Sequence, residues 1–181
     1  GVSVPFSQAV PYGFTMSDNN SGGRALVEID NGNNITISHM MLSGVSCCHE
    51  SFTGGPYGVH GNGIGQNFTL KNSAVIQMKS DPIHLNGPGS GTLIDHVYIA
   101  VNEGLLSTNH GQGIWLKDSG AATIRNSFFD DVAGTAVVVC GGGTVGCNDL
   151  NIYGNVFYHS RTHPQSSGGN VSGDEVTYLI E

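Results

Sequence analysis

Apolar and polar residues alternate in short runs along this chain, and one such run recurs five times. Each copy has two alternating apolar residues, a small polar or histidine corner, and then another apolar residue. The copies span residues 34–42, 67–75, 91–99, 121–129 and 149–157. Because alternation with a period of two is typical of β-strands, each copy predicts short strand structure broken by a corner.

Aligning the five copies places their apolar residues in two columns. One column is Ile37, Leu70, Ile94, Ile124 and Ile152, and the other is Leu42, Val75, Ile99, Phe129 and Phe157. Successive members are 24 to 33 residues apart, as from Leu70 to Ile94 and from Ile37 to Leu70. This spacing is typical of a solenoid that stacks one coil on the next.

A second set of strand-like segments falls between the first, at residues 27–29, 59–61, 83–85, 114–116 and 137–139. Their central residues are Glu28, His60, His84, Trp115 and Val138, which lie 32, 24, 31 and 23 residues apart. Alternate residues of a strand face opposite sides, so the flanking aliphatic residues are expected to point inward and the centres outward.

The two sets together predict an all-β solenoid, with parallel sheets wound around one apolar interior. At roughly 4.8 Å per coil, about six coils give a rod of about 30 Å. We expect one domain over residues 1–181, with an N-terminal strand or extension at 1–23, core coils at 24–159, and a C-terminal loop and strand at 160–181. The sequence gives little indication of helices, because glycine interrupts nearly every segment long enough to show a 3.6-residue apolar period.

Residues 113–119 followed by 122–128 resemble the generic coil repeat of the pectin-lyase-like superfamily, and the resemblance extends over about residues 24–159. It implies a single-stranded, right-handed parallel β-helix. The superfamily contains pectate lyases, polygalacturonases, alginate epimerases, phage tailspike depolymerases, adhesins and non-catalytic fibres. The fold analogy therefore does not select a function.

Charge and composition narrow the classes of partner. Only 11% of the residues are charged and the net charge is −8, so the Lys/Arg footprint needed to bind nucleic acid is absent. No run of eighteen apolar residues predicts a membrane span. A soluble face built from Asn, Ser, Thr and Gly instead favours an extracellular protein or one on a cell or virion surface.

The cysteines and the glycosylation sequons are consistent with the same extracellular or surface location. Cys140 and Cys147 would close a small glycine-rich loop as a disulfide, whereas Cys47 and Cys48 are expected either as buried thiols or in one bridge between coils. Sequons begin at Asn19, Asn34, Asn67 and Asn170. Asn34 and Asn67 share one repeat position, where glycans would line one edge of the rod.

Three residues are candidates for catalysis on a polysaccharide: His84, Asp95 and His96. The segment 94–96 resembles the Ile-Asp-His portion of a pectate-lyase signature, but the arginine pattern of those enzymes is missing and His96 also fits the corner column. His84 follows Asp81-Pro82, which resembles an alginate-epimerase motif with one inserted residue and equally describes a turn. Asp130-Asp131 is a weak pair for glycoside hydrolysis, because neighbouring strand residues face opposite sides.

The outward residues His60, His84 and Trp115 would form a stripe for contact with carbohydrate or with another subunit. No close spacing of ligands nominates a metal site, so no cofactor is expected; calcium would be implied only if the chain were a lyase.

Strand-like segments at both termini predict an uncapped rod that associates with itself. We therefore expect a secreted, structural β-helical subunit that assembles end to end into a fibre or surface appendage. The alternative is a polysaccharide lyase, hydrolase or epimerase-like enzyme, or a fragment of a phage tailspike depolymerase.

Overall fold

The computed structural model of the chain is all-β and built from parallel strands. It describes residues 13–17, 25–44, 57–78, 81–102, 112–117, 120–132, 135–139, 149–158 and 178–180, which contain fifteen strands and no helix. The predicted disulfide of Cys140 and Cys147, the residues Cys47 and Cys48, and the sequons at Asn19 and Asn170 lie outside these residues.

The described strands form two sheets in which every recorded pairing is parallel. The six-stranded sheet has the order β15 (Tyr178–Ile180), β12 (Val137–Val139), β9 (Ile114–Lys117), β7 (Ile83–Asn86), β5 (Tyr57–Ile64) and β2 (Ala25–Gly32). The nine-stranded sheet follows the path β1 (Phe14–Ser17), β4 (Met40–Ser43), β6 (Thr69–Ile76), β8 (Thr92–Asn102), β10 (Ala122–Arg125) and β13 (Leu150–Tyr153). Beside this path, β3 (Thr36–Ser38) pairs with β6, while β11 (Phe128–Val132) pairs with β8 and with β14 (Val156–Tyr158).

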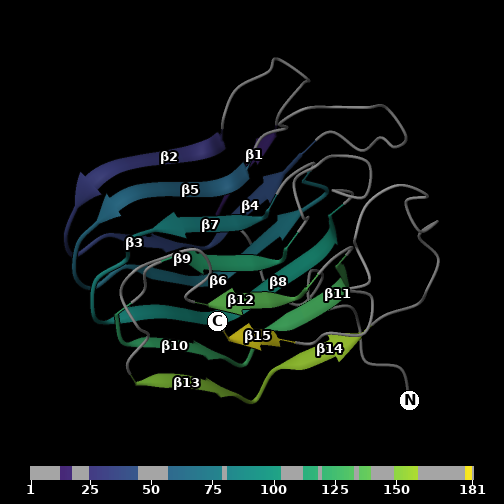
Figure 1. The fold of residues 1–181 in the computed structure, drawn as a ribbon. Coiled ribbons are helices and arrows are strands. Elements are labelled where there is room, and N and C mark those ends of the chain that lie inside the picture. The colour runs from purple at the N-terminus through teal and green to yellow at the C-terminus, as the bar shows by residue number, and fades with distance from the viewer. Residues whose placement is uncertain are drawn as a thin grey trace, which may run out of the picture.

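From β2 onward the chain visits the two sheets in turn, and each return to a sheet adds the next neighbouring strand. Figure 1 shows the outcome as two stacks of arrows that run from β2 at one end to β13 and β14 at the other. Both apolar columns found in the sequence are confirmed residue by residue. Ile37 pairs with Leu70, Leu70 with Ile94, Ile94 with Ile124, and Ile124 with Ile152; Leu42 pairs with Val75, Val75 with Ile99, Ile99 with Phe129, and Phe129 with Phe157.

The columns supply the core from both sheets. Leu70 and Ile94 of the nine-stranded sheet belong to the same fully buried cluster as Ile83 and Leu85 of the six-stranded sheet. Burying each such side chain contributes about 1.5–3 kcal/mol. The Phe129 ring also stacks on Phe157, with centroids 4.8 Å apart, so one aromatic pair continues the second column toward the β14 end.

The polar corner of the repeat is a left-handed backbone turn. Its column is His39, Asn72, His96, Asn126 and Gly154, whose φ angles lie between 48° and 66°. Asn, His and Gly adopt this region more readily than other residues, which explains their recurrence there. At Gly154 a Cβ atom would also lie 2.7 Å from Asn126 Oδ1, so a larger residue would require that side chain to move. His96 therefore occupies the corner column, as the repeat predicts.

Candidate functional site

The central residues of the six-stranded sheet form one column, which we call the outward column. Glu28 pairs with His60, His60 with His84, His84 with Trp115, and Trp115 with Val138. The flanking residues Val59, Ile83 and Leu85 belong to the core cluster, whereas none of the five centres does. The register and the facing predicted from the sequence are thus confirmed.

The two imidazoles of this column are nevertheless buried, with 1% of His60 and 8% of His84 exposed. Tyr57 packs on both: its ring lies 4.9 Å from each imidazole, stacked on His60 and edge-on to His84. The two imidazoles are 5.4 Å apart, and Trp115 lies 4.8 Å from His84 on the other side. The expected stripe exists, but its histidines lie beneath their neighbours.

Each buried imidazole is paired with a carboxylate through Nδ1. His60 Nδ1 lies 2.7 Å from Glu28 Oε1, and His84 Nδ1 lies 2.8 Å from Asp81 Oδ2. Asp81 is itself only 3% exposed, and its Oδ1 accepts a 2.9 Å hydrogen bond from the Gln112 backbone N–H. Because Asp81-Pro82 directly precede β7, this turn holds the carboxylate against His84 and also ties β7 to the segment before β9.

A second column lies two residues further along the same strands: Asp30, Asn62, Asn86 and Lys117. Asn86 Nδ2 donates to Asn62 Oδ1 at 2.9 Å, and Asn62 Nδ2 donates to Asp30 Oδ1 at 3.5 Å. Asn86 Oδ1 lies 3.2 Å from His84 Nε2, and its Nδ2 lies 3.5 Å from His60 Nε2. We call the chain from Asp30 through Asn62 to Asn86 the amide ladder.

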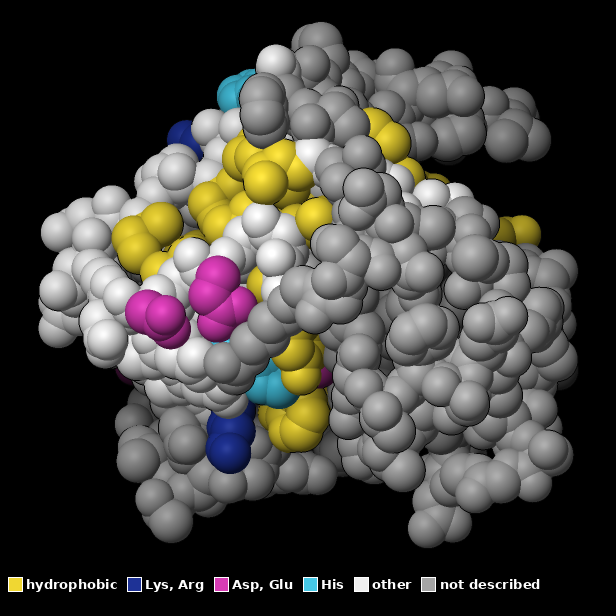
Figure 2. Space-filling model, turned by 90° about the horizontal axis from the view of Figure 1, so that it is seen from above, with side chains coloured by type: hydrophobic (Ala, Val, Ile, Leu, Met, Phe, Trp, Pro, Cys, Tyr) yellow, Lys and Arg dark blue, Asp and Glu magenta, His cyan; other side chains and the backbone are white. Residues whose placement is uncertain are grey.

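The amide ladder is the part of this site that a ligand can reach. Asp30 is exposed, and Asn62, Asn86, Lys117 and Trp115 are partly exposed. The indole Nε1 of Trp115 is buried and has no hydrogen-bond partner among the residues that the structure describes. Figure 2 looks onto the β2 end of the molecule, where hydrophobic, acidic and histidine side chains come close together on the described surface. The side-chain amides of the ladder thus offer hydrogen-bond donors and acceptors beside the aromatic ring of Trp115.

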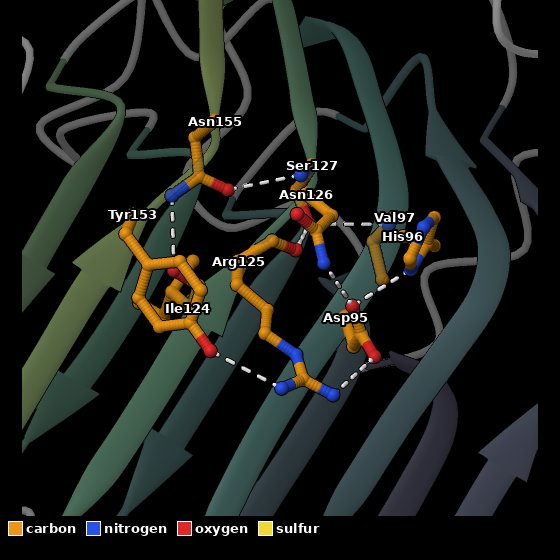
Figure 3. Close-up of polar contacts among 9 residues, drawn as sticks. All are labelled: Asp95, His96, Val97, Ile124, Arg125, Asn126, Ser127, Tyr153 and Asn155. Atoms are coloured by element: carbon orange, nitrogen blue, oxygen red, sulfur yellow. Dashed lines mark hydrogen bonds and ion pairs between the residues drawn. The ribbon is translucent and has the colours of Figure 1, made fainter.

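A different polar cluster lies on the nine-stranded sheet, centred on Asp95 of β8. Its carboxylate accepts hydrogen bonds from Arg125 Nη2 at 2.9 Å, from Asn126 Nδ2 at 3.1 Å and from His96 Nδ1 at 2.7 Å. Arg125 Nη1 also donates to the Tyr153 hydroxyl at 3.1 Å. We call this set the Asp95 cluster; Figure 3 shows Asp95 between the Arg125 guanidinium and the His96 ring.

The Asp95 cluster is partly exposed to solvent. Half of the His96 side chain and 36% of Arg125 are exposed, against 14% of Asp95. Partial burial alone raises the pKa of Asp95, but the hydrogen bonds from Arg125, Asn126 and His96 outweigh it and hold that pKa below its usual value. The same Asp95 contact raises the pKa of Arg125.

The structure does not bring the three catalytic candidates into one site. His84 lies on β7 of the six-stranded sheet, whereas Asp95 and His96 lie on β8 of the nine-stranded sheet. The Asp130 carboxylate accepts a 2.6 Å hydrogen bond from the Tyr98 hydroxyl. Asp131 follows in the same strand, and its side chain lies outside the described residues.

Two predicted glycosylation sites can be placed. Asn34 and Asn67 are both exposed and have φ angles of 58° and 61°. Asn67 Nδ2 donates to Asn34 Oδ1 at 2.9 Å, so the two asparagines stack in one column, as their shared repeat position predicts.

No group of three or more His, Cys, Asp or Glu residues within the described part of the chain is arranged to hold a metal ion. Over the same residues no helix is long and apolar enough to cross a membrane.

The sequence identifies His60, His84 and Trp115 and places Glu28 in the same column, but it does not predict that Glu28 and Asp81 pair with the two histidines. The signal for the amide ladder was present, because Asp30, Asn62, Asn86 and Lys117 each stand two positions after a member of the outward column. The sequence places Asp81 in a segment that resembles an alginate-epimerase motif or forms a turn, and neither interpretation predicts its pairing with His84.

Comparison of the chain with models of protein families, with curated proteins and with solved structures gives no match. The pectin-lyase-like resemblance therefore remains a prediction from the coil repeat alone.

Proposed function

We propose that this chain is a right-handed parallel β-helix of about six coils that binds a polysaccharide on the outer face of its six-stranded sheet. The fold supports this interpretation because successive strands alternate between two parallel sheets in constant register. Connections between parallel strands are right-handed in the great majority of proteins. The low charge and the polar, Asn-rich surface support a secreted or surface location.

One observation carries the binding proposal: the amide ladder runs across three neighbouring strands and lies beside Trp115. Hydroxyl groups of a sugar need both donors and acceptors, which side-chain amides supply, and an aromatic face covers the C–H surface of the sugar ring. His84 and His60 lie beside the ladder on the same strands and contact Asn86. Direct contact with the sugar is therefore assigned to Asn62, Asn86 and Trp115.

A binding role is preferred over cleavage. The candidate acid–base residues are divided between the two sheets, and the histidine nearest the ladder is buried against Asp81. A lyase, hydrolase or epimerase remains the alternative, and it predicts unsaturated products or new reducing ends from the polysaccharide that binds.

The test is binding of polygalacturonate, alginate and neutral galactomannan to the immobilised protein. At least one of the three is expected to bind the native chain, and Asn62→Ala is expected to weaken that binding about tenfold, the effect of one well-made hydrogen bond. The matched control is Asn151→Ala, an exposed strand asparagine on the nine-stranded sheet. Equal binding by both variants, or no binding of the native chain, would overturn the proposal.

Self-assembly is a second candidate function, favoured by the β13–β14 end. Tyr153, Val156, Phe157 and Tyr158 are 51%, 50%, 36% and 54% exposed, which places four large hydrophobic side chains on the last strands of the nine-stranded sheet. Such an edge pairs readily with another chain. If it does, the mass measured by light scattering rises with concentration, and Val156→Lys abolishes the rise. Thr123→Lys leaves it unchanged, because Thr123 lies on the inner strand β10, which is paired on both sides.

A further inference from the structure

The two ends of the described strand stack are stepped, and the steps lie on different sheets. We call one passage of the chain through both sheets a round. The last complete round consists of β12, β13 and β14, and β15 extends beyond it on the six-stranded sheet alone. The first complete round consists of β2, β3 and β4, and β1 extends beyond it on the nine-stranded sheet alone. Each end therefore carries half a round, and the two halves are complementary.

We propose that copies of this chain stack head to tail by joining these two half-rounds. The inference rests on the self-association given above as a second candidate function, and it names the partner and the surfaces. In the joint, β15 of one copy pairs with β2 of the next, while β1 of that next copy pairs with β14 of the first. β15 and β1 then lie at the same level and belong to one shared round.

The observed register predicts which residues meet across the joint. Phe157 belongs to the apolar column that continues through Leu42 to Met16 on β1. In the other sheet, one column leads from Tyr178 on β15 to Val27 on β2. Stacking in the same register places Phe157 beside Met16 and Tyr178 beside Val27. Both Met16 and Val27 already pack against the core cluster, so the joint extends the apolar interior from one copy into the next.

The β14 end has the composition and the exposed surface that a second copy needs. Neither β13, β14 and β15 nor β1 contains a charged residue, whereas the exposed edge strands of monomers are commonly protected by charges or proline. Tyr153, Phe157 and Tyr158 are 51%, 36% and 54% exposed. Together they present roughly 300 Å² of aromatic side-chain surface. This is more than a third of the about 800 Å² that each partner buries in a standard interface, and the paired strand edges add to it.

The β2 end supports stacking head to tail over stacking tail to tail. Val27 and Ile29 on β2 are only partly buried, although Val59 on the neighbouring β5 is completely buried. Figure 2 shows hydrophobic side chains on this end of the molecule. A tail-to-tail dimer covers the β14 end but leaves the β2 end exposed, whereas head-to-tail stacking covers both. Because such a contact joins two different surfaces, it produces an open filament and not a closed dimer.

The first test blocks one end at a time. Val156→Lys places a charge on β14 and Met16→Lys places one on β1. At a concentration where the native chain assembles, each variant alone is expected to remain monomeric, since it keeps only one working end. An equimolar mixture is expected to form a dimer, with twice the monomer mass by light scattering, because one intact end of each kind is present. Dimers of Met16→Lys alone would contradict the head-to-tail joint, and circular dichroism verifies that both variants are folded.

The second test uses cross-linking and needs no blocked end. Thr15 and Val156 occupy the same register position on β1 and β14. The joint therefore places their Cα atoms about 4.8 Å apart, within the range that a disulfide spans. Under mild oxidation, the double variant Thr15→Cys/Val156→Cys is expected to give a ladder of covalent oligomers on a non-reducing gel. Each single variant is expected to give only the background of the native chain with its own four cysteines.

The outcomes separate this inference from the functions proposed above. A covalent dimer from Val156→Cys alone, or no ladder from the double variant of an assembling protein, overturns the head-to-tail joint and leaves self-association standing. A native chain that stays monomeric at every concentration overturns both self-association and the joint. Binding of polysaccharide to the six-stranded sheet is measured separately and is decided by neither result.

Discussion

The outer faces of the two sheets carry polar residues on neighbouring strands in the same kind of register, yet they differ in burial. On the six-stranded sheet, His60, His84 and Asp81 are 1%, 8% and 3% exposed. On the nine-stranded sheet, half of the His96 side chain and 51% of Tyr153 are exposed. Burying a polar group costs free energy unless it is hydrogen-bonded. Loss of one hydrogen bond is therefore expected to destabilise the buried residues of the six-stranded sheet more than the solvated Asp95 cluster of the nine-stranded sheet. The repeat alone therefore does not predict which face of the molecule carries a functional site.

The largest effect is expected from Asp81→Ala. This change removes the carboxylate that both the buried His84 ring and the Gln112 N–H contact. Leaving a buried polar group unsatisfied costs about 1–3 kcal/mol, and two such groups are affected here. Urea unfolding monitored by circular dichroism measures the loss. Asp81→Asn, which keeps the shape and the acceptor for Gln112, should lose less; equal losses would show that the charge, and not the shape, matters at this position.

A smaller loss is expected from His96→Val, which tests the corner interpretation of the Asp95 cluster. His96 has a φ of 53°, and a β-branched residue there is strained by about 1–3 kcal/mol. His96→Asn adopts the same backbone conformation, as Asn72 and Asn126 do in the same column. The asparagine variant should therefore unfold at nearly the native urea concentration. If the two variants were equally destabilised, the side chain and not the backbone would explain the histidine.

These residues also show how far the sequence predicts the structure. The apolar columns, the outward column and the corner column all follow from spacing, because strand register in stacked coils repeats with the sequence. Burial of His60 and His84 does not follow, since it depends on ring contacts with Tyr57 and Trp115. The Asp81–His84 pair joins a turn to a strand, so no period predicts it. The hydrogen bonds of the amide ladder depend on side-chain positions, which the sequence does not give.

Arg125→Ala should have a weaker effect than either change above. The Arg125–Asp95 pair is partly exposed and surrounded by solvent, where salt screens the attraction between charges. We expect the difference in urea midpoint between this variant and the native protein to shrink as NaCl is added. A difference that is independent of salt would mean that the guanidinium acts through packing against Tyr153.

Acid should remove the smallest contribution, that of the Asp95 charge. Because the pKa of Asp95 is lowered in the folded state, its stabilisation is fully present above its ordinary value of 3.8 and is lost as the pH falls through the folded-state pKa. The stability difference between the native protein and Asp95→Asn is therefore expected to be constant near neutrality and to narrow below about pH 4. Urea midpoints over this pH range measure the stability difference. A difference that widens in acid would mean that folding raises the pKa of Asp95 instead of lowering it.

The most direct test of the functional assignment uses Trp115, the one tryptophan of the chain. Its indole N–H gives a single assignable signal beside the amide ladder, while the Arg125 guanidinium reports on the opposite sheet. Fragments of polygalacturonate, alginate and galactomannan are titrated into ¹⁵N-labelled protein. We predict that a binding fragment shifts the indole signal and the Asn62 and Asn86 side-chain amides, and leaves Arg125 unchanged. Shifts confined to Arg125, Asn126 and Tyr153 would place the binding face on the nine-stranded sheet and contradict the account.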